Sequence, residues 1–139
     1  MIIGIISGYF NPLHYGHIEY IGGAKKQCNL LIAIINNDFQ VGLKGSKPFM
    51  DEKHRGKIVS SIKEIDDTII SIDQDRTVCQ SIRLLHKVYS YYEMRFFNSG
   101  DRGNNNVESA EVKLCEELGI HYVFLDLPKI FSSSEILKH

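Results

Sequence analysis

The chain has 139 residues, the size of a single domain with one hydrophobic core, and we assign residues 1–139 to one domain. Its composition is 43% hydrophobic and 24% charged, with a formal net charge of −1, which is typical of a globular protein. Because no dense cluster of Lys and Arg gives a basic face, we exclude polymeric nucleic acid as a partner. No apolar run of about 18 residues occurs, so we expect no membrane span.

The cysteines and the first residues predict the cellular compartment. Cys28, Cys79 and Cys115 are far apart and show no paired spacing, which argues against a disulfide framework and against a zinc site. Residues 1–7 (MIIGIIS) have neither the basic region nor the cleavage site of a signal peptide. We therefore expect buried free thiols and a cytoplasmic protein.

Strand signals and helix signals alternate along the chain. Short apolar, β-branched runs such as LLIAII predict buried strands, whereas apolar residues at helical spacing, such as Val78, Ile82, Leu85 and Val88, predict helices. In chain order we expect a strand at 1–7, a helix at 16–28, a strand at 30–35, a loop at 36–49, a helix at 50–63, a strand at 67–72, a helix at 77–89, a strand at 94–99, a helix at 107–119, a strand at 120–127 and a helix at 132–139.

This alternation predicts an α/β fold of one domain, Rossmann-like, with a five-stranded parallel sheet and helices on both faces. In such sheets ligands bind beyond the carboxyl ends of the strands. The peptides that follow strands carry most of the unusual polar and glycine residues of the chain. These peptides are SGYFNPLHYGH, NNDFQVGLKG, NSGDRGNN and PKIFSSS.

The first of these peptides places two histidines at the start of a helix. Gly8 allows backbone N–H groups to approach a ligand closely, and a helix N-terminus favours phosphate oxygens. His14 and His17 are three residues apart, so their imidazoles project to roughly the same side of the first helical turn. Together they can stabilise the negative charge that develops on a phosphoryl group.

Two other interpretations of the histidine pair stay open. A His-x-x-His pair can supply two metal ligands, but no nearby carboxylate or cysteine completes a zinc set, so we expect no protein-bound metal. Alternatively, the two imidazoles only pack or cap the helix. The coincidence of a strand, a glycine, a proline and His-x-Gly-His in one peptide favours the phosphate interpretation.

Residues 8–21 (GYFNPLHYGHIEYI) resemble the signature of the nucleotidyltransferase superfamily that carries the His-x-Gly-His motif. The similarity runs through most of the chain and is closest to the cytidylyltransferase-like members, including glycerol-3-phosphate cytidylyltransferase and heptose-phosphate adenylyltransferase. The further segments that carry it are AKKQCNLLIAIINND, LKGSKPFMDEKHRGKIVSSIKEIDD, GDR at 100–102 and PKIFSSSEI.

The resemblance implies an enzyme that transfers a nucleoside monophosphate from a triphosphate to a phosphorylated small molecule and releases pyrophosphate. The implied catalytic residues are His14, His17, Lys44 and Arg55. The implied nucleotide-binding residues are Gly8, Tyr9, Phe10, His14, His17, Asp101, Arg102, Lys129, Ser132, Ser133 and Ser134.

Local chemistry agrees with two of these roles. Lys44 lies between Gly42 and Gly45, in a basic loop that can close over phosphates. Arg55 lies near the start of a helix, where a cation opposes the dipole, so we expect its partner to be a ligand phosphate or, alternatively, a surface acid such as Asp51 or Glu52.

The same resemblance implies a Mg²⁺ ion that arrives with the triphosphate, and a homodimer. We expect CTP as the donor and a small phosphorylated alcohol, sugar or polyol as the acceptor. Tyr9 and Asn11 depart from the usual Thr or Cys and Asp of the glycerol-phosphate enzymes, so an adenylyltransferase that uses ATP to make a cofactor or an ADP-sugar is the alternative. A nucleotide-binding module without catalysis is a second alternative.

Overall fold

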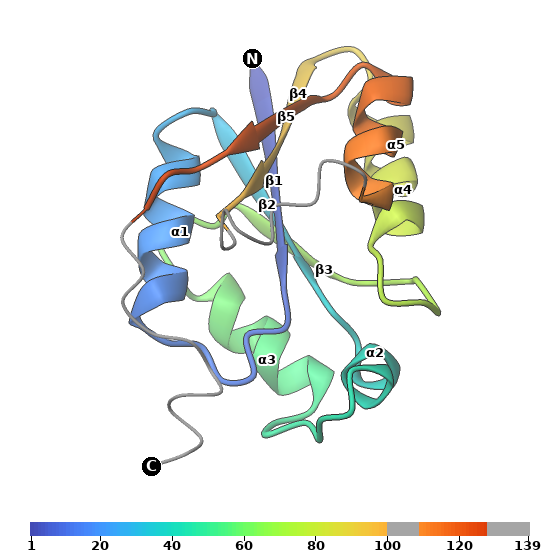
Figure 1. The fold of residues 1–139 in the computed structure, drawn as a ribbon. Helices are drawn as coiled ribbons and strands as arrows, with labels where there is room; N and C mark the ends of the chain where they lie inside the picture. Colours follow the sequence, from blue (N-terminus) through green and yellow to red (C-terminus); the bar gives the residue numbers. More distant parts are fainter. Residues whose placement is uncertain (100–108, 128–139) are drawn as a thin grey trace.

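The structure is a computed structural model that describes residues 1–99 and 109–127 (Figure 1). Five parallel strands form one sheet in the order β3-β2-β1-β4-β5, which confirms the predicted fold class. The strands are β1 (Ile2–Gly8), β2 (Leu30–Ile35), β3 (Asp67–Ile70), β4 (Glu93–Asn98) and β5 (His121–Phe124). The helices are α1 (Tyr15–Lys25), α2 (Asp38–Leu43), α3 (Glu52–Ser60), α4 (Cys79–Tyr89) and α5 (Ala110–Leu118).

The sheet has a hydrophobic core on each face, because successive side chains of a strand point to opposite sides. On one face Ile3 and Ile5 of β1 pack with residues of α4 and α5, such as Ile82 and Leu114. On the other face Ile6 packs with residues of α1 and α3. Figure 1 shows the same two layers, with α1 and α3 on one side of the sheet and α4 and α5 on the other.

Short-range patterns placed most elements correctly but misjudged several ends. The helix expected at 50–63 ends at Ser60, and the helix expected from residue 77 begins at Cys79. Val88, expected on the buried face of that helix, is 61% exposed. Of the three cysteines, Cys115 is buried as predicted, whereas Cys28 and Cys79 are only half-buried free thiols.

The prediction of a loop over residues 36–49 was wrong, because residues 38–43 form helix α2. The Asn37 side chain accepts a hydrogen bond from the Gln40 N–H, and the Gln40 side chain accepts one from the Asn37 N–H. This reciprocal capping satisfies two of the N–H groups that a helix start leaves unpaired. A helix of six residues is too short for a periodic apolar pattern to reveal it.

The strand order brings the peptides after β1 and β2 together. Gly8 and Ile35 are partners at the carboxyl ends of the two strands, and the Asn36 N–H donates to the Gly8 carbonyl at 2.9 Å. On the other side, β1 is next to β4, so the strand order changes direction there, which is where open α/β sheets bind ligands. None of the described helices combines the length and the apolar character needed to cross a bilayer.

Candidate active site

The turn after β1 folds a buried phenylalanine back under the histidines. Phe10 is 1% exposed and has a φ of 49°, a left-handed conformation that costs a non-glycine residue free energy. A Cβ atom at Gly8 would lie 3.0 Å from the Phe10 ring, closer than an ordinary van der Waals contact, so a side chain there would require that ring to shift. The Phe10 ring in turn packs edge-on against the His17 ring, with 4.8 Å between centroids.

Both histidines cap the start of helix α1. His14 Nδ1 accepts a hydrogen bond from the Gly16 N–H at 3.1 Å, and His17 Nδ1 accepts one from the His14 N–H at 3.1 Å. Their rings stack with 3.9 Å between centroids and 29° between planes. The sequence correctly predicted that the two imidazoles lie on one side of the first turn, and neither is sealed in the core, since both side chains are partly exposed.

The capping bonds fix the chemistry of the remaining ring nitrogens. Since each Nδ1 accepts from a backbone N–H, each neutral imidazole carries its proton on Nε2 and can donate one hydrogen bond there. Burial lowers the pKa of His17 to about 3, with further contributions from His14 and from the Lys44 charge. Burial also lowers the pKa of His14. At neutral pH the pair therefore offers two N–H donors rather than two cations.

Lys44 lies close to this pair. Its ammonium nitrogen is 4.4 Å from the centroid of the Tyr9 ring, a cation–π geometry, and its charge contributes to the lowered pKa of His17. Lys44 is the residue that ends helix α2, and Gly45, with a φ of 85°, turns the chain away from it. The structure thus brings Tyr9, His14, His17 and Lys44 together, as the sequence predicted for one site.

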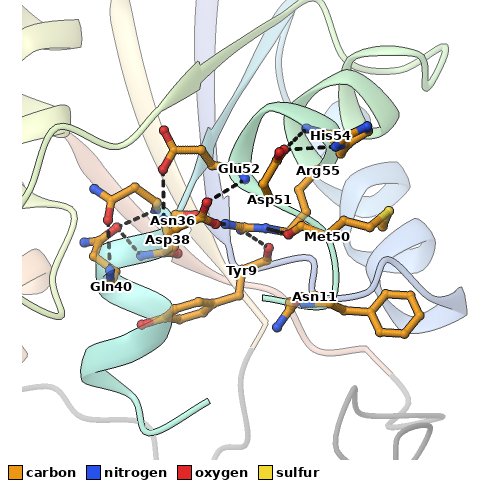
Figure 2. Close-up of polar contacts among 12 residues, drawn as sticks. Tyr9, Asn11, Asn36, Asp38, Gln40, Met50, Asp51, Glu52, His54 and Arg55 are labelled. Carbon is orange, nitrogen blue, oxygen red and sulfur yellow. Dashed lines mark hydrogen bonds and ion pairs between the residues drawn. The ribbon is translucent and has the colours of Figure 1, made fainter. Parts of the chain in front are cut away.

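Arg55 has different surroundings from those expected. Its side chain is fully buried, and its guanidinium donates to the carbonyl oxygens of Tyr9 and Asn36, each at 2.7 Å, and of Met50 at 3.0 Å (Figure 2). Its ion-pair partner is Asp38, at 2.6 Å, not Asp51, Glu52 or an open position for phosphate. In this structure Arg55 joins the peptides after β1 and β2 to α2 and α3.

Two acidic residues connect α2 to α3 beside Arg55 (Figure 2). The Asp38 N–H donates to the Glu52 side chain at 2.9 Å, and the Glu52 N–H donates to the Asp38 side chain at 3.2 Å. Gln40, which is 0% exposed, donates to the carbonyl oxygens of Asp75 and Thr77. Sequence reasoning missed these supports, although the three-residue spacing of Asn37 and Gln40 was a capping signal.

The other predicted binding residues are not all in the described part of the chain. Gly8 and Phe10 line the turn, as already given. Asp101, Arg102, Lys129, Ser132, Ser133 and Ser134 lie outside the described residues, so their roles stay predictions. A cavity of about 160 Å³ lies at the carboxyl ends of β1, β4 and β5, the same edge of the sheet as the histidines. It is lined by Ser7, Phe96, Phe97, Asn98, Ser109, Glu111 and Tyr122.

The described residues do not fit a metal ion held by protein ligands alone. No group of three or more His, Cys, Asp or Glu side chains within residues 1–99 and 109–127 has the geometry to hold one. The Nδ1 atoms of His14 and His17 are engaged with backbone N–H groups, which removes one ligand position from each ring. The Mg²⁺ ion expected with a triphosphate stays a prediction.

Comparison with known proteins identifies the family of this site. The family model described as cytidylyltransferase-like matches residues 5–136. The chain belongs to the cytidylyltransferase-like family. This confirms the enzyme class that the sequence predicted, a nucleotidyltransferase, at the level of the family.

Relatives of this cytidylyltransferase-like chain include two kinds of protein. It is 38% identical over 134 residues to the FAD synthase of Picrophilus torridus, covering 94% of this chain and 89% of that protein. It is 28% identical over 138 residues to the bifunctional protein HldE of Nitrobacter hamburgensis. That alignment covers 98% of this chain but only 26% of the HldE protein, so the chain spans about a quarter of that relative.

Solved structures share the fold. The lipopolysaccharide core biosynthesis protein of Thermoplasma volcanium superposes with a TM-score of 0.69 at 22% identity, covering 92% of this chain and 98% of that one. The bifunctional NMN adenylyltransferase/ADP ribose pyrophosphatase of Francisella tularensis superposes with a TM-score of 0.71 at 18% identity, covering 98% of this chain and 40% of that one.

Proposed function

We propose that this chain is an adenylyltransferase that transfers AMP from ATP to a phosphorylated small molecule and releases pyrophosphate. The observation that carries the proposal is the pair of stacked imidazoles at the start of α1, each with Nδ1 bonded to the backbone and Nε2–H left as a donor. The start of a helix adds a partial positive charge at the same place. Such a site suits the oxygens of a triphosphate.

In the proposed reaction a phosphate oxygen of the acceptor attacks the α-phosphorus, and the bond from that phosphorus to the bridging oxygen breaks. Pyrophosphate leaves with the bonding electrons, and no covalent intermediate with the protein is needed. Catalysis then depends on position and on charge stabilisation. The two Nε2–H groups would donate to the α-phosphoryl oxygens, whose negative charge the Lys44 ammonium would also stabilise.

Two features support ATP as the donor. FAD synthase is a relative that this chain matches over most of both lengths, and FAD consists of flavin mononucleotide joined to AMP. Tyr9 and Asn11, which depart from the usual residues of the glycerol-phosphate enzymes, already pointed to an adenylyltransferase as the alternative. Flavin mononucleotide is therefore the first acceptor to test, followed by sugar phosphates.

A cytidylyltransferase that uses CTP is the second candidate, because the matching family model is described as cytidylyltransferase-like. In either case we propose that Gly8, Tyr9, Phe10, Asp101, Arg102, Lys129, Ser132, Ser133 and Ser134 contribute to nucleotide binding. We assign Arg55 an indirect role, since its buried guanidinium is engaged by three backbone carbonyls and the Asp38 carboxylate. Mg²⁺ and a homodimer are further parts of the proposal.

The test separates capping from catalysis. Asn is a preferred N-cap residue and Gln a usual capping-box partner, so His14→Asn and His17→Gln keep the start of α1 but remove each imidazole. We expect each variant to lower turnover by about a hundredfold or more, the scale of losing an oriented transition-state donor. The measurement is pyrophosphate release from ATP, CTP, GTP and UTP with flavin mononucleotide and with sugar phosphates.

The control is the melting temperature of both variants, which we expect to stay close to that of the wild type because the caps remain. Turnover within threefold of wild type in either variant, on whichever acceptor the wild type accepts, would contradict the assigned roles. Pyrophosphate release from CTP alone would favour the second candidate. Nucleotide binding with no release for any acceptor would favour a binding module.

A further inference from the structure

We propose that Tyr9 and Asn11 are positioning residues that hold residues 44–49, the lysine loop, against the histidine segment in the absence of nucleotide. The inference rests on the proposed function in one respect, the role of Lys44 toward phosphate. The two positioning residues, which we name the loop clamp, contact the lysine loop at its two ends.

Asn11 holds the far end of the lysine loop. Its side-chain amide donates to the Lys47 carbonyl at 3.0 Å, and its side-chain oxygen accepts from the Phe49 N–H at 2.5 Å. The residue is 8% exposed, so these two backbone groups satisfy a nearly buried carboxamide. Asn is specifically suited to this position, because an ionised Asp keeps the acceptor but has no proton to donate to the Lys47 carbonyl.

Tyr9 holds the near end. Its ring faces the Lys44 ammonium at 4.4 Å, and the Tyr9 carbonyl is itself fixed by the buried Arg55 guanidinium at 2.7 Å. Burial raises the pKa of the Tyr9 hydroxyl, and the nearby Arg76 charge opposes this rise. Arg55 therefore fixes the Tyr9 backbone, and the Tyr9 ring contacts the Lys44 ammonium from this fixed position.

The clamp matters because the lysine loop has few supports of its own. Residues 42–49 are all exposed. The other hydrogen bonds described for the loop backbone are local, such as those from Ser46 N–H to the Val41 carbonyl and from Gly45 N–H to the Gly42 carbonyl. Exposed segments with few packed contacts open at low free-energy cost. The three contacts made by the clamp join residues that are more than thirty positions apart in the chain, and they limit that opening.

Limited proteolysis tests the clamp directly. Trypsin can cut the Lys44–Gly45 bond in the loop but not the Lys47–Pro48 bond, because proline follows the lysine. Cleavage after Lys57 and Lys63 in the same digest gives an internal reference in and just after α3. When opening is fast, cleavage at Lys44 follows the population of the open loop. The digest is run without nucleotide and resolved by mass spectrometry.

We expect Asn11→Asp to speed cleavage at Lys44 about three- to tenfold, the effect of losing one buried hydrogen bond, without the same change at Lys57 and Lys63. Tyr9→Leu should speed it as well, because the aromatic face is lost. Tyr9→Phe keeps the ring and should be cut close to the wild-type rate. This pair keeps the proposal testable if Asn11→Asp does not fold.

Two results would overturn the clamp. One is cleavage at Lys44 at the wild-type rate in both Asn11→Asp and Tyr9→Leu. The other is an equal acceleration at all three lysines, which would show that these residues support the whole fold rather than the loop. Equal cleavage of Tyr9→Leu and Tyr9→Phe would remove the role of the aromatic face, and the clamp as stated would fail.

A kinetic measurement connects the clamp to the proposed function. In Asn11→Asp we expect the KM for the nucleoside triphosphate to rise about three- to tenfold while kcat changes less, because the open loop must be ordered when the nucleotide binds. If the wild-type chain shows no transfer with any acceptor, the proposed function fails but the digest still tests the clamp. If transfer occurs but the KM for the triphosphate is unchanged in Asn11→Asp, the clamp is contradicted and the proposed function stands.

Discussion

At the scale of single residues, His14 and His17 combine two roles that the sequence left as alternatives. Capping occupies Nδ1 of each ring, and the proposed phosphate contact uses Nε2. The capping bonds therefore serve the proposed chemistry, because they set the tautomer and the direction of the free N–H group. Phe10 strengthens this arrangement by packing against the His17 ring from a strained backbone position.

The lowered pKa of His17 predicts that this residue destabilises the fold in acid. Its folded-state pKa is about 3, against an ordinary value near 6.5. The contribution of the neutral His17 imidazole to the free energy of unfolding is fully present above pH 6.5. It is lost as the pH drops toward 3, since the unfolded chain binds a proton at His17 at a higher pH than the folded chain does. We expect the wild type to lose up to about 1.4 kcal/mol per pH unit more than His17→Gln between pH 6 and 4.

The measurement for this prediction is urea unfolding of both proteins at several pH values. Taking the difference from His17→Gln cancels the other groups that titrate in this range, apart from the direct coupling with His14. If the free energy of unfolding depends on pH in the same way in both proteins down to pH 4, the pKa of His17 is not lowered and the prediction fails.

Residue types predicted the site only in part. Histidines in a His-x-Gly-His peptide are informative because their spacing and the following helix fix their relative position. The acidic partner of Arg55 was predicted wrongly as Asp51 or Glu52, because a charged side chain near a helix start is normally exposed and nothing in the local sequence indicates burial. Its three carbonyl partners come from segments at residues 9, 36 and 50, which only the folded chain brings together.

At the scale of elements, Arg55 determines how α2 and α3 meet the sheet. Helix α2 has only six residues and is stabilised by its caps and by the Asp38–Arg55 ion pair. Because Lys44 ends this helix, the position of Lys44 depends on these contacts. Asp38 and Glu52 add a pair of reciprocal bonds between the two helix starts, so α2 and α3 form one unit.

Removal of Arg55 should therefore destabilise the fold strongly. We expect Arg55→Met to lower the free energy of unfolding by about 3–5 kcal/mol, because Asp38 and three carbonyl groups lose their buried partner. The matched control is Arg95→Met, which breaks the more exposed pair with Glu93 and should cost about 1 kcal/mol or less. Urea unfolding measures both, and equal losses would contradict the role of Arg55.

At the scale of the whole molecule, the sequence predicted the architecture but not the strand order. Alternating buried runs and helical patterns are local, and they imply a parallel sheet because each crossover contains a helix. The order β3-β2-β1-β4-β5 depends on contacts such as Ile3 with Met94, which are distant in the chain. The same order gathers the histidine peptide, α2 and the cavity at one edge of the sheet.

That shared edge predicts that nucleotide binding stabilises the entire fold, since the ligand would contact peptides after several strands. A ligand at a hundred times its Kd adds about 2.7 kcal/mol to the free energy of unfolding, which for a chain of this length raises the Tm by about 10 °C. We expect ATP with Mg²⁺ to raise the Tm more than CTP at equal concentration. Thermal unfolding with each of the four triphosphates is the measurement.

The histidine variants show whether such a shift comes from the proposed site. In His14→Asn and His17→Gln the ATP-dependent rise in Tm should shrink, because each variant removes one imidazole donor to phosphate while the helix start is kept. An undiminished rise in both variants would place the triphosphate elsewhere on the molecule. A larger rise with CTP than with ATP would reverse the choice of base, because the affinity difference between two triphosphates acts on the same folded state and can come only from contacts with the base.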